Sequence, residues 1–401
     1  MNSKTILTLF IISFFLTSCV EPNKNIEKLI AINDSLKEQF APDKRVSIYD
    51  IKITPFQDKI LVKGETDQPE ALKNLKEKLS LEPIEIIDSI VLLPDNSVGE
   101  LIYAVVNNSV ANIRSNPKHS AELGTQALMG TGLKVLKHEG DFYRVQTPDA
   151  YISWVDHGGI TLFNHKDYLT WNEADKVIYT KTVGNVYSSE NQNGPIVSDI
   201  VLGAQLKLAE QVGNFFKVSY PDNRIGYIKI DEGEIYRTWL NNLKASGELI
   251  ENYAKQFLGS PYLWGGTSTK GMDCSGFTKT VYLMNGYIIP RDASQQIWAG
   301  KNVDPDLEFE GLEKGDLLFF GTKATADKKQ RVTHVGIWLD NDRGEFIHSS
   351  KQVRLSSIDP NSPYYDESNA KRYLGARRYL NIKDPMLTNL KTDVILTNIE
   401  P

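Results

Sequence analysis

The chain has 401 residues, enough for about two to four domains, and its 41% hydrophobic and 24% charged residues are ordinary for a globular protein. The formal net charge of −6 gives no basic footprint for nucleic acid, so we expect no nucleic-acid partner. The two cysteines, Cys19 and Cys274, are too few for a disulfide framework.

The first segment has the pattern of an export signal. Lys4 supplies the positive charge, residues 5–16 form a short apolar run, and residues 16–19 read Leu-Thr-Ser-Cys. This ending resembles a bacterial lipobox, which implies removal of residues 1–18 and lipidation of Cys19. Acyl chains there would anchor the protein to a membrane, and we expect the periplasmic face in a Gram-negative bacterium. An ordinary signal peptide with a chance cysteine remains the alternative.

The next two segments carry no recognisable chemistry. Residues 19–44 are polar with apolar side chains at helical spacing, which predicts a helix or a tether. Residues 45–97 predict a small α+β domain of order β-β-α-β, with a helix at 69–79 that begins at Pro69. Its last part contains two short apolar stretches, 84–87 and 90–92, that are predicted to be strands.

An internal repeat follows. Ala-Asn-Ile at 111–113 matches Gly-Asn-Val at 184–186, and further matches keep the same 73-residue offset (184 against 111, for example). Short strands separated by Gly, Asn and Pro-Asp turns predict two small β-barrels, at 98–165 and 170–232. The repeat resembles the bacterial SH3-like domain, and the second copy is the more divergent.

Cys274 opens the most informative stretch, which lies in a predicted domain at 246–381 that is followed by a tail at 382–401. A Gly-rich polar loop leads to Asp273, and Phe277 and Val281 then follow at helical spacing. Asp273 is therefore the predicted N-cap and Cys274 the first residue of a helix. We expect a helix N-terminus to lower the pKa of the thiol and make it a nucleophile. A buried structural cysteine remains the alternative.

Two histidines downstream are candidate partners of the thiol. A three-residue loop at 341–343 predicts a hairpin in which Gly336 lies opposite His348, with His334 on the same face. His334 would then act as general base, and His348 would orient it. A pairing slipped by one residue would separate the two histidines. Zinc bound by Cys274, His334 and His348 is a further alternative, although no closely spaced ligand pair marks a zinc site.

Residues from 248 to about 380 resemble the NlpC-type cysteine peptidases of bacterial cell walls. The matching motifs are Pro-Tyr-Leu-Trp-Gly-Gly at 261–266, Asp-Cys-Ser-Gly-Phe at 273–277, Pro-Arg-Asp-Ala-Ser-Gln-Gln at 290–296, Gly-Asp-Leu-Leu-Phe-Phe at 315–320, His-Val-Gly-Ile at 334–337 and Phe-Ile-His at 346–348. The resemblance implies an α+β protein whose papain-like catalytic domain follows the two barrels and the small N-terminal segment. It also implies a triad of Cys274, His334 and His348 with no cofactor.

A narrower resemblance is to the γ-D-glutamyl-L-diamino-acid endopeptidases, which have two SH3-like domains and accept peptides with a free N-terminal L-alanine. It implies that Asp273 pairs with the substrate ammonium. The other implied substrate-binding residues are Tyr262, Ser275, Asp292, Ser294, Glu122 and Tyr151. Ala and Ser stand beside Tyr151 where relatives have Gly, and Ala293 stands where some relatives have Ser.

The function expected from sequence is hydrolysis of the peptidoglycan stem peptide between γ-D-glutamate and the L-diamino acid. Two other classes of function stay open. One is an amidase or acyltransferase on the same fold, and the other is a non-catalytic lipoprotein that binds the wall through its barrels.

Overall fold

The computed structural model describes residues 22–393, and Cys19 with the export signal lies outside them. The described chain divides into two compact units, the first comprising residues 22–42 and 48–92 and the second residues 43–47 and 93–393. None of the helices in this described part has the length and apolar character needed to cross a membrane.

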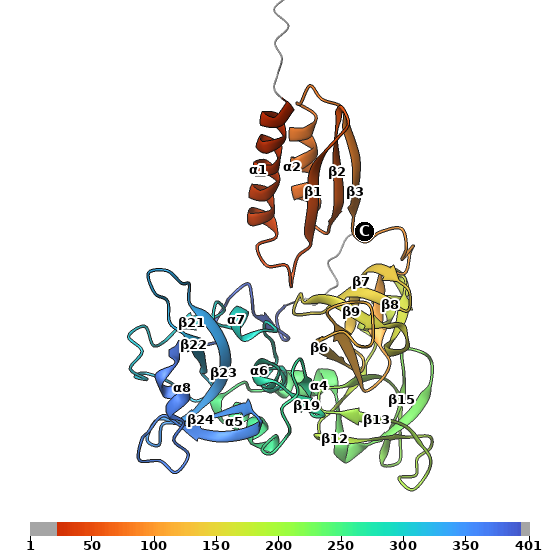
Figure 1. Ribbon diagram of the computed structural model, residues 1–401. Helices are drawn as coiled ribbons and strands as arrows, with labels where there is room; N and C mark the ends of the chain where they lie inside the picture. Colours follow the sequence, from red (N-terminus) through yellow and green to blue (C-terminus); the bar gives the residue numbers. More distant parts are fainter. Residues whose placement is uncertain (1–21, 394–401) are drawn as a thin grey trace, which may run out of the picture. The chain divides into compact units, whose positions relative to one another are not determined.

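The first unit has the β-β-α-β order expected from the sequence, preceded by a helix (red to orange in Figure 1). Its elements are α1 (Pro22–Phe40), β1 (Tyr49–Phe56), β2 (Lys59–Thr66), α2 (Pro69–Leu79) and β3 (Ile86–Leu92). The two short strands expected at 84–87 and 90–92 are one strand, because β3 pairs with β2 in parallel without interruption. Leu29 of α1 and Leu75 of α2 are fully buried in the same core, so residues 19–44 include a packed helix.

The second unit contains two β-barrels (Figure 1), and the sheet of each barrel has seven strands. The first has β4 (Tyr103–Val106), β5 (Val110–Arg114), β6 (Leu123–Leu128), β7 (Gly132–Glu139), β8 (Phe142–Gln146), β9 (Ile152–Asp156) and β10 (Ile160–Phe163). The second has β11 (Lys176–Tyr179), β12 (Val183–Tyr187), β13 (Ile196–Val201), β14 (Gln205–Val212), β15 (Phe215–Ser219), β16 (Ile225–Lys229) and β17 (Gly233–Ile235). The strand order of the second sheet reproduces that of the first, strand for strand, as the sequence repeat requires.

The catalytic domain packs helices against a six-stranded sheet of order β21-β26-β22-β23-β24-β25. Helices α3 (His165–Glu173) and α4 (Tyr236–Asn242) follow the first and second barrels, and the domain's own elements come after them. These are α5 (Gly247–Gln256), β18 (Thr267–Ser268), β19 (Gly271–Met272), α6 (Cys274–Leu283), β20 (Tyr287–Ile288), α7 (Ala293–Gln296), β21 (Lys301–Asn302), β22 (Leu317–Thr322), β23 (Arg331–Asp340), β24 (Glu345–Ser350), β25 (Gln352–Ser357), α8 (Glu367–Lys371), β26 (Tyr373–Arg378) and β27 (Thr388–Asn389).

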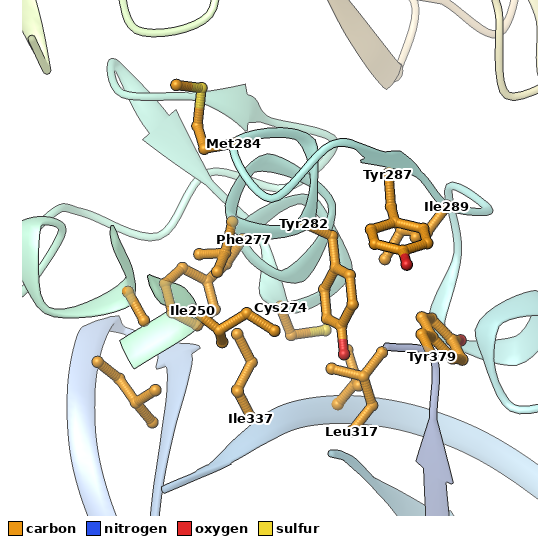
Figure 2. Packing of buried hydrophobic residues seen from close by; sticks show 14 of the residues in the cluster. Ile250, Cys274, Phe277, Tyr282, Met284, Tyr287, Ile289, Leu317, Ile337 and Tyr379 are labelled. Atoms are coloured by element: carbon orange, nitrogen blue, oxygen red, sulfur yellow. The ribbon is translucent and has the colours of Figure 1, made fainter. Parts of the chain in front are cut away.

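The core of this domain lies between α6 and the sheet (Figure 2). Phe277 and Val281 of α6 are fully buried, and so are Val335 and Ile337 of β23. The alternate residues of β23 therefore point into the core, and His334 and Gly336 belong to the other set of side chains. The expected tail also contributes, because β27 pairs with β20.

Candidate active site

Cys274 is the first residue of α6, as the sequence predicts, and its side chain is 7% exposed. The helix starts there because the Asp273 carboxylate accepts a hydrogen bond from Gly276 N–H at 2.7 Å, the capping arrangement that satisfies a free N–H group of the first turn. Gly286, at φ +82°, follows the helix end at the expected place. The sulfur thus lies where first-turn N–H groups can meet a carbonyl oxygen.

The charge state of Cys274 differs from the sequence-based prediction. Burial raises the pKa of the thiol to about 12, with the neighbouring Asp273 carboxylate adding to the effect and a backbone hydrogen bond from Val335 and the charge of Arg291 opposing it. The expected lowering by the helix N-terminus is outweighed because desolvation disfavours the thiolate. The resting nucleophile is a neutral thiol, so its proton must leave as the bond to carbon forms.

The two histidines lie together as the hairpin register predicts. His334 Nε2 and His348 Nδ1 are 2.6 Å apart, and a Cβ placed on Gly336 would lie 3.2 Å from the His348 Cβ. Ile337 pairs with Ile347, which is the predicted register. At the turn the pairing shifts by one residue, so Asp340 pairs with Glu345. Gly336 keeps the face open between the histidines, since a Cβ there would lie only 3.0 Å from Phe346 and 3.2 Å from His348 and would require one of them to shift.

Two further residues set the orientation of His348. Its Nε2 lies 3.0 Å from the Ser356 hydroxyl and 4.0 Å from an Asp366 carboxylate oxygen. The carboxylate favours a proton on Nε2, which leaves Nδ1 as the acceptor for the His334 Nε2–H group. His334 then keeps Nδ1 unprotonated, and this is the nitrogen available as a base toward the thiol.

Burial keeps both imidazoles neutral. It lowers the pKa of His334 to about 4, with Arg372 adding to the effect, and it lowers the pKa of His348 to about 2, with His334 adding to the effect. A neutral imidazole and a neutral thiol can act as an acid–base pair in which one proton moves during attack. The arrangement therefore suits nucleophilic addition of sulfur to a carbonyl with His334 as the proton carrier.

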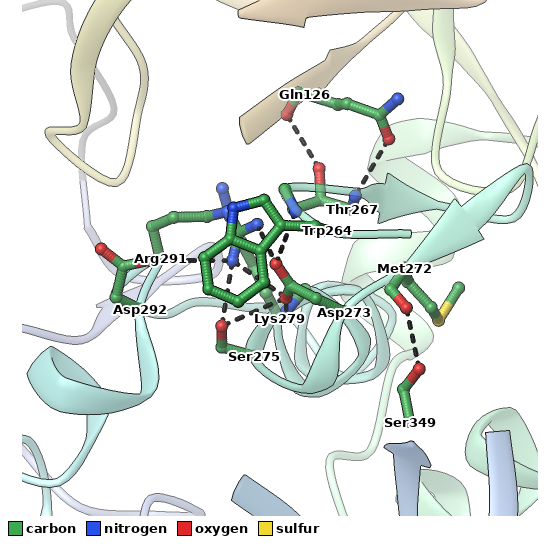
Figure 3. Close-up of polar contacts among 12 residues, drawn as sticks. Gln126, Trp264, Thr267, Met272, Asp273, Ser275, Lys279, Arg291, Asp292 and Ser349 are labelled. Carbon is green, nitrogen blue, oxygen red and sulfur yellow. Dashed lines mark hydrogen bonds and ion pairs between the residues drawn. The ribbon is translucent and has the colours of Figure 1, made fainter. Parts of the chain in front are cut away.

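Asp273, which is expected to bind the substrate ammonium, lies in a buried hydrogen-bond network. Its carboxylate is 7% exposed and accepts hydrogen bonds from Arg291 Nη2 at 2.7 Å and from the Gly265 N–H at 2.9 Å, in addition to the cap (Figure 3). Arg291 is itself 1% exposed, so the two charges compensate each other inside the protein. No contact in the structure tests the role of Asp273 toward a substrate ammonium, so that role stays a prediction.

Three other residues expected to bind substrate already have polar partners in the protein. They are Ser275, Asp292 and Ser294. The Ser275 hydroxyl lies 3.0 Å from Arg291 Nη1. Asp292 is the N-cap of α7, with a reciprocal capping box to Gln295, and its second oxygen accepts a hydrogen bond from Arg45 at 2.8 Å. The Ser294 hydroxyl accepts another from Arg45 at 2.8 Å. Arg291 and Arg45 thus hold these side chains in place, and their expected substrate-binding roles stay predictions.

Two residues of the first barrel that are expected to bind substrate lie on the side of the barrel that faces the catalytic domain. They are Glu122 and Tyr151. The Glu122 carboxylate accepts a hydrogen bond from Trp264 Nε1 at 2.6 Å. The Tyr151 hydroxyl packs against Gly124, where an added Cβ would lie 3.1 Å away. Burial raises the pKa of Tyr151 to about 12, with the charge of Asp292 adding to the effect. Glu122 is exposed and keeps one oxygen outside the hydrogen bond to Trp264.

Tyr262 lies beside the nucleophile. Burial raises the pKa of its phenol, and the next two contributions come from the charges of Cys274 and Asp273. Its backbone N–H donates to Lys351 O at 2.9 Å, which ties the loop before α6 to the turn after β24. The phenol stays protonated and is a hydrogen-bond donor next to the sulfur.

Sequence reasoning did not assign roles to Arg291, Ser356, Asp366 or Arg45. Arg291 sits inside the 290–296 motif, and a search for a cation to compensate the buried Asp273 would have found it. Ser356 could have been found by extending the hairpin, since His348 pairs with Arg354 and Ser356 is two residues further along. Asp366 and Arg45 come from distant segments, and no sequence pattern places them here.

In the described chain, residues 22–393, no group of three or more His, Cys, Asp and Glu residues is arranged to hold a metal ion. His334 and His348 point ring nitrogens at each other, and the outer nitrogen of His348 faces Ser356. The zinc alternative therefore gains no support from the geometry.

A cysteine at a helix N-terminus, a neutral histidine base and a histidine that orients it define a cysteine peptidase with a papain-like fold. The comparisons agree and give the family. The NlpC/P60 family profile matches residues 259–378, and the bacterial SH3 domain profile matches residues 109–161. The chain belongs to the NlpC/P60 family.

Two curated relatives show how far the likeness extends. A gamma-D-glutamyl-L-lysine dipeptidyl-peptidase of Bacillus cereus (strain ATCC 10987 / NRS 248) is 34% identical over 275 residues, which span 65% of this chain and 76% of the relative. A protein of the same name from Bacillus subtilis (strain 168) is 32% identical over 242 residues, 58% of this chain and 74% of the relative. Both matches extend well beyond the 120 residues of the catalytic profile.

One solved structure is similar over nearly all of its length. The crystal structure of an NlpC/P60 family protein from Bacillus cereus ATCC 10987 is 27% identical to this chain, with a TM-score of 0.59. The match covers 99% of that chain and 69% of this one. Barrels and catalytic domain thus share one architecture with that protein.

Proposed function

We propose that this protein is a peptidoglycan stem-peptide hydrolase that cleaves the amide bond between γ-D-glutamate and an L-diamino acid. The observation that carries the proposal is the His334–His348 pair at 2.6 Å in the same domain as Cys274, in a chain whose first barrel reaches the catalytic loop through Glu122 and Trp264. The names of the two Bacillus relatives support this substrate class.

The reaction proceeds in two acyl transfers. The Cys274 sulfur adds to the γ-carbonyl carbon of D-glutamate while the thiol proton passes to His334. His334 gives that proton to the leaving amine, the C–N bond breaks, and a thioester remains. Water then adds to the thioester, the C–S bond breaks, and the proton returns to sulfur. One water is consumed, and the products are a peptide with a free γ-carboxyl group and a peptide with a free amine.

We further propose that the preferred substrates begin with a free L-alanine. The buried Asp273–Arg291 pair carries no net charge toward the cleft, so Glu122 and Tyr151 of the first barrel become the groups that receive the ammonium. The ammonium would donate to the free Glu122 oxygen in a charge-assisted hydrogen bond. An N-acylated alanine has no such charge and would leave the carboxylate without a cationic partner.

The test uses soluble protein starting after Cys19, with C274A as the inactive control. The substrates are L-Ala-γ-D-Glu-diaminopimelate and its N-acetylated form, and the products are identified by mass spectrometry. We expect release of L-Ala-D-Glu from the free-amine peptide alone, and none with C274A. Equal cleavage of both forms contradicts the amine-recognition proposal. Cleavage of neither contradicts the peptidase proposal and favours the binding-module or acyltransferase alternatives.

We also propose that the mature protein is a lipoprotein held at the periplasmic face of a membrane. The supporting observation is the Leu-Thr-Ser-Cys sequence that ends an apolar run at Cys19. Fractionation of cells that express the full chain or a C19A variant tests this. The full chain is expected with the membranes, and a membrane-bound C19A protein would contradict the anchor.

A further inference from the structure

A short segment that precedes the barrels in the chain belongs to the second unit, which contains the barrels and the catalytic domain. Residues 43–47, called the strap here, cluster with the second unit although they interrupt the first. The strap is held on one side by the first barrel. The Ile152 N–H donates to Arg45 O at 2.7 Å, and the Gln146 side chain donates to Val46 O at 3.3 Å. These bonds place the strap along the start of β9, next to Tyr151.

The side chain of Arg45 reaches the catalytic domain from the other side of the strap. Its Nη1 donates to Asp292 at 2.8 Å and to Ser294 at 2.8 Å. Its Nε and Nη2 donate to Asp43, at 2.8 and 2.7 Å, and Asp43 also accepts a hydrogen bond from Gln295 at 2.9 Å. One guanidinium thus joins a carboxylate of the strap to the N-terminus of α7.

These contacts link the first barrel to the catalytic domain. Asp292 follows Arg291, whose guanidinium holds the Asp273 carboxylate beside Cys274. Tyr151 precedes Ile152, which binds the strap from the barrel. The strap therefore spans from Tyr151, which the proposed function puts near the free amine of the substrate, to Asp292 of the catalytic domain.

We propose that the strap closes the unprimed end of the substrate cleft and that Arg45 is a specificity-determining residue that excludes stem peptides with an acylated L-alanine. This inference rests on the proposed function and adds to it a residue from outside both the barrels and the catalytic domain. A group attached to the alanine nitrogen must extend past the amine site toward the strap. It can do so only by breaking the pairing of Arg45 with Asp43 and Asp292, and it offers neither carboxylate a replacement cation.

The balance of charge agrees with this arrangement. Burial opposes the charge of Arg45, yet the contacts with Asp43 and Asp292 raise its pKa. The Arg45 guanidinium donates hydrogen bonds to both the Asp43 and the Asp292 carboxylates, and these contacts hold its charge in place. Arg45 is half-buried, with 32% of its side chain exposed, so the closure is local and the segment can be changed without opening a core.

The experiment compares kcat/KM for L-Ala-γ-D-Glu-diaminopimelate with kcat/KM for its N-acetylated form in four proteins. They are the wild type, R45A, R45K and K44A, all starting after Cys19. Lys44 is the matched control because it is the exposed neighbour of Arg45 in the same strap and carries the same charge. The free-amine preference is the ratio of kcat/KM for the free-amine peptide to kcat/KM for its N-acetylated form. We expect this ratio to fall about tenfold or more in R45A, because it measures how much more tightly the enzyme binds one transition state than the other. K44A keeps the wild-type preference, and R45K lies between R45A and the wild type.

The outcomes separate the two proposals. A wild type that cleaves neither peptide refutes the proposed function itself. An active wild type with an unchanged preference in R45A overturns the role of Arg45. Equal loss of activity on both peptides in R45A also overturns it, since a merely structural residue would act in this way. If R45A has a lower melting temperature than the wild type, R45Q replaces it, because glutamine keeps a polar side chain in the strap without the charge.

Discussion

Activity at low pH depends on the environment of His334. A base must be neutral to accept the thiol proton, and burial lowers the pKa of His334 from its ordinary value to about 4. Protonation on acidification therefore removes the base near pH 4 and not near pH 6.5. In a pH profile measured with the free-amine peptide, we expect kcat/KM to decline on the acidic side near pH 4. The same shift reduces the stability of the fold as the pH falls from 6.5 through 4, because the unfolded chain binds the proton more tightly.

The control is circular dichroism at each pH, which separates loss of the base from loss of the fold. An acidic limb near pH 6.5 on folded protein would contradict a buried, neutral His334.

The thiol should titrate in the opposite direction. Burial raises the pKa of Cys274 to about 12, so the thiolate fraction grows tenfold per pH unit across the accessible range. We expect the rate of alkylation by iodoacetamide to rise steadily from pH 6 to pH 9 with no plateau. The protein that starts after Cys19 has only this thiol, and C274A gives the blank. A plateau that begins near neutral pH would mean that the resting pair is a thiolate and an imidazolium.

The catalytic elements depend on contacts that cross from the first barrel. Gln126 of β6 is 7% exposed, and its side-chain oxygen accepts hydrogen bonds from the Thr267 N–H at 2.9 Å and the Ser268 hydroxyl at 3.0 Å. Figure 3 shows the Gln126–Thr267 contact beside the Asp273–Arg291 network. Gly265, just before β18, approaches so closely that a Cβ would lie 2.1 Å from Leu123 O. The loop that carries Asp273 is thus shaped by the barrel.

Replacement of Gln126 should destabilise the second unit. Q126A leaves the buried Thr267 N–H without its acceptor, which costs about 1–3 kcal/mol. Urea unfolding followed by circular dichroism measures this, with Q211A as the control because Gln211 is an exposed glutamine on β14. A free energy of unfolding equal to that of Q211A would show that water replaces the barrel contact.

The elements around the triad could be predicted because their signals are local. Asp273 at the N-cap, the side-chain alternation of β23 and Gly336 opposite His348 each follow from a few neighbouring residues. What the sequence could not supply depends on distant partners. From the sequence alone, Asp273 looks like an unpaired charge, because no local pattern shows that it forms an ion pair with Arg291. The pKa of Cys274 depends on its burial, which the whole domain produces. The 43–47 strap reaches Asp292 across 247 positions of sequence, a pairing that no periodicity encodes.

At the scale of the molecule, the second unit has a core that crosses its domain boundaries. Ile178 and Leu202 of the second barrel belong to the same buried cluster as Phe277 and Ile337 of the catalytic domain. The barrels also approach each other closely, since a Cβ on Gly130 would lie 2.0 Å from Gln205 O. Because the second barrel and the catalytic domain share this core, unfolding of one alone would expose apolar side chains of the other to water. Separate unfolding of the two domains is therefore unfavourable. The first unit has its own core around Leu29 and Val62.

This division predicts two unfolding transitions. The first unit is small and buries a smaller fraction of its surface, so it should open at a lower urea concentration. The second barrel and the catalytic domain should open together at a higher one, because they share buried side chains. Hydrogen exchange with mass spectrometry, measured across a urea series, follows peptides from each part separately. Peptides around Ile178 and around Phe277 are expected to lose protection at one urea concentration. If the barrel peptides exchange first, the core between the domains does not hold them together, and the strap and the Gln126 contact must maintain the cleft by themselves.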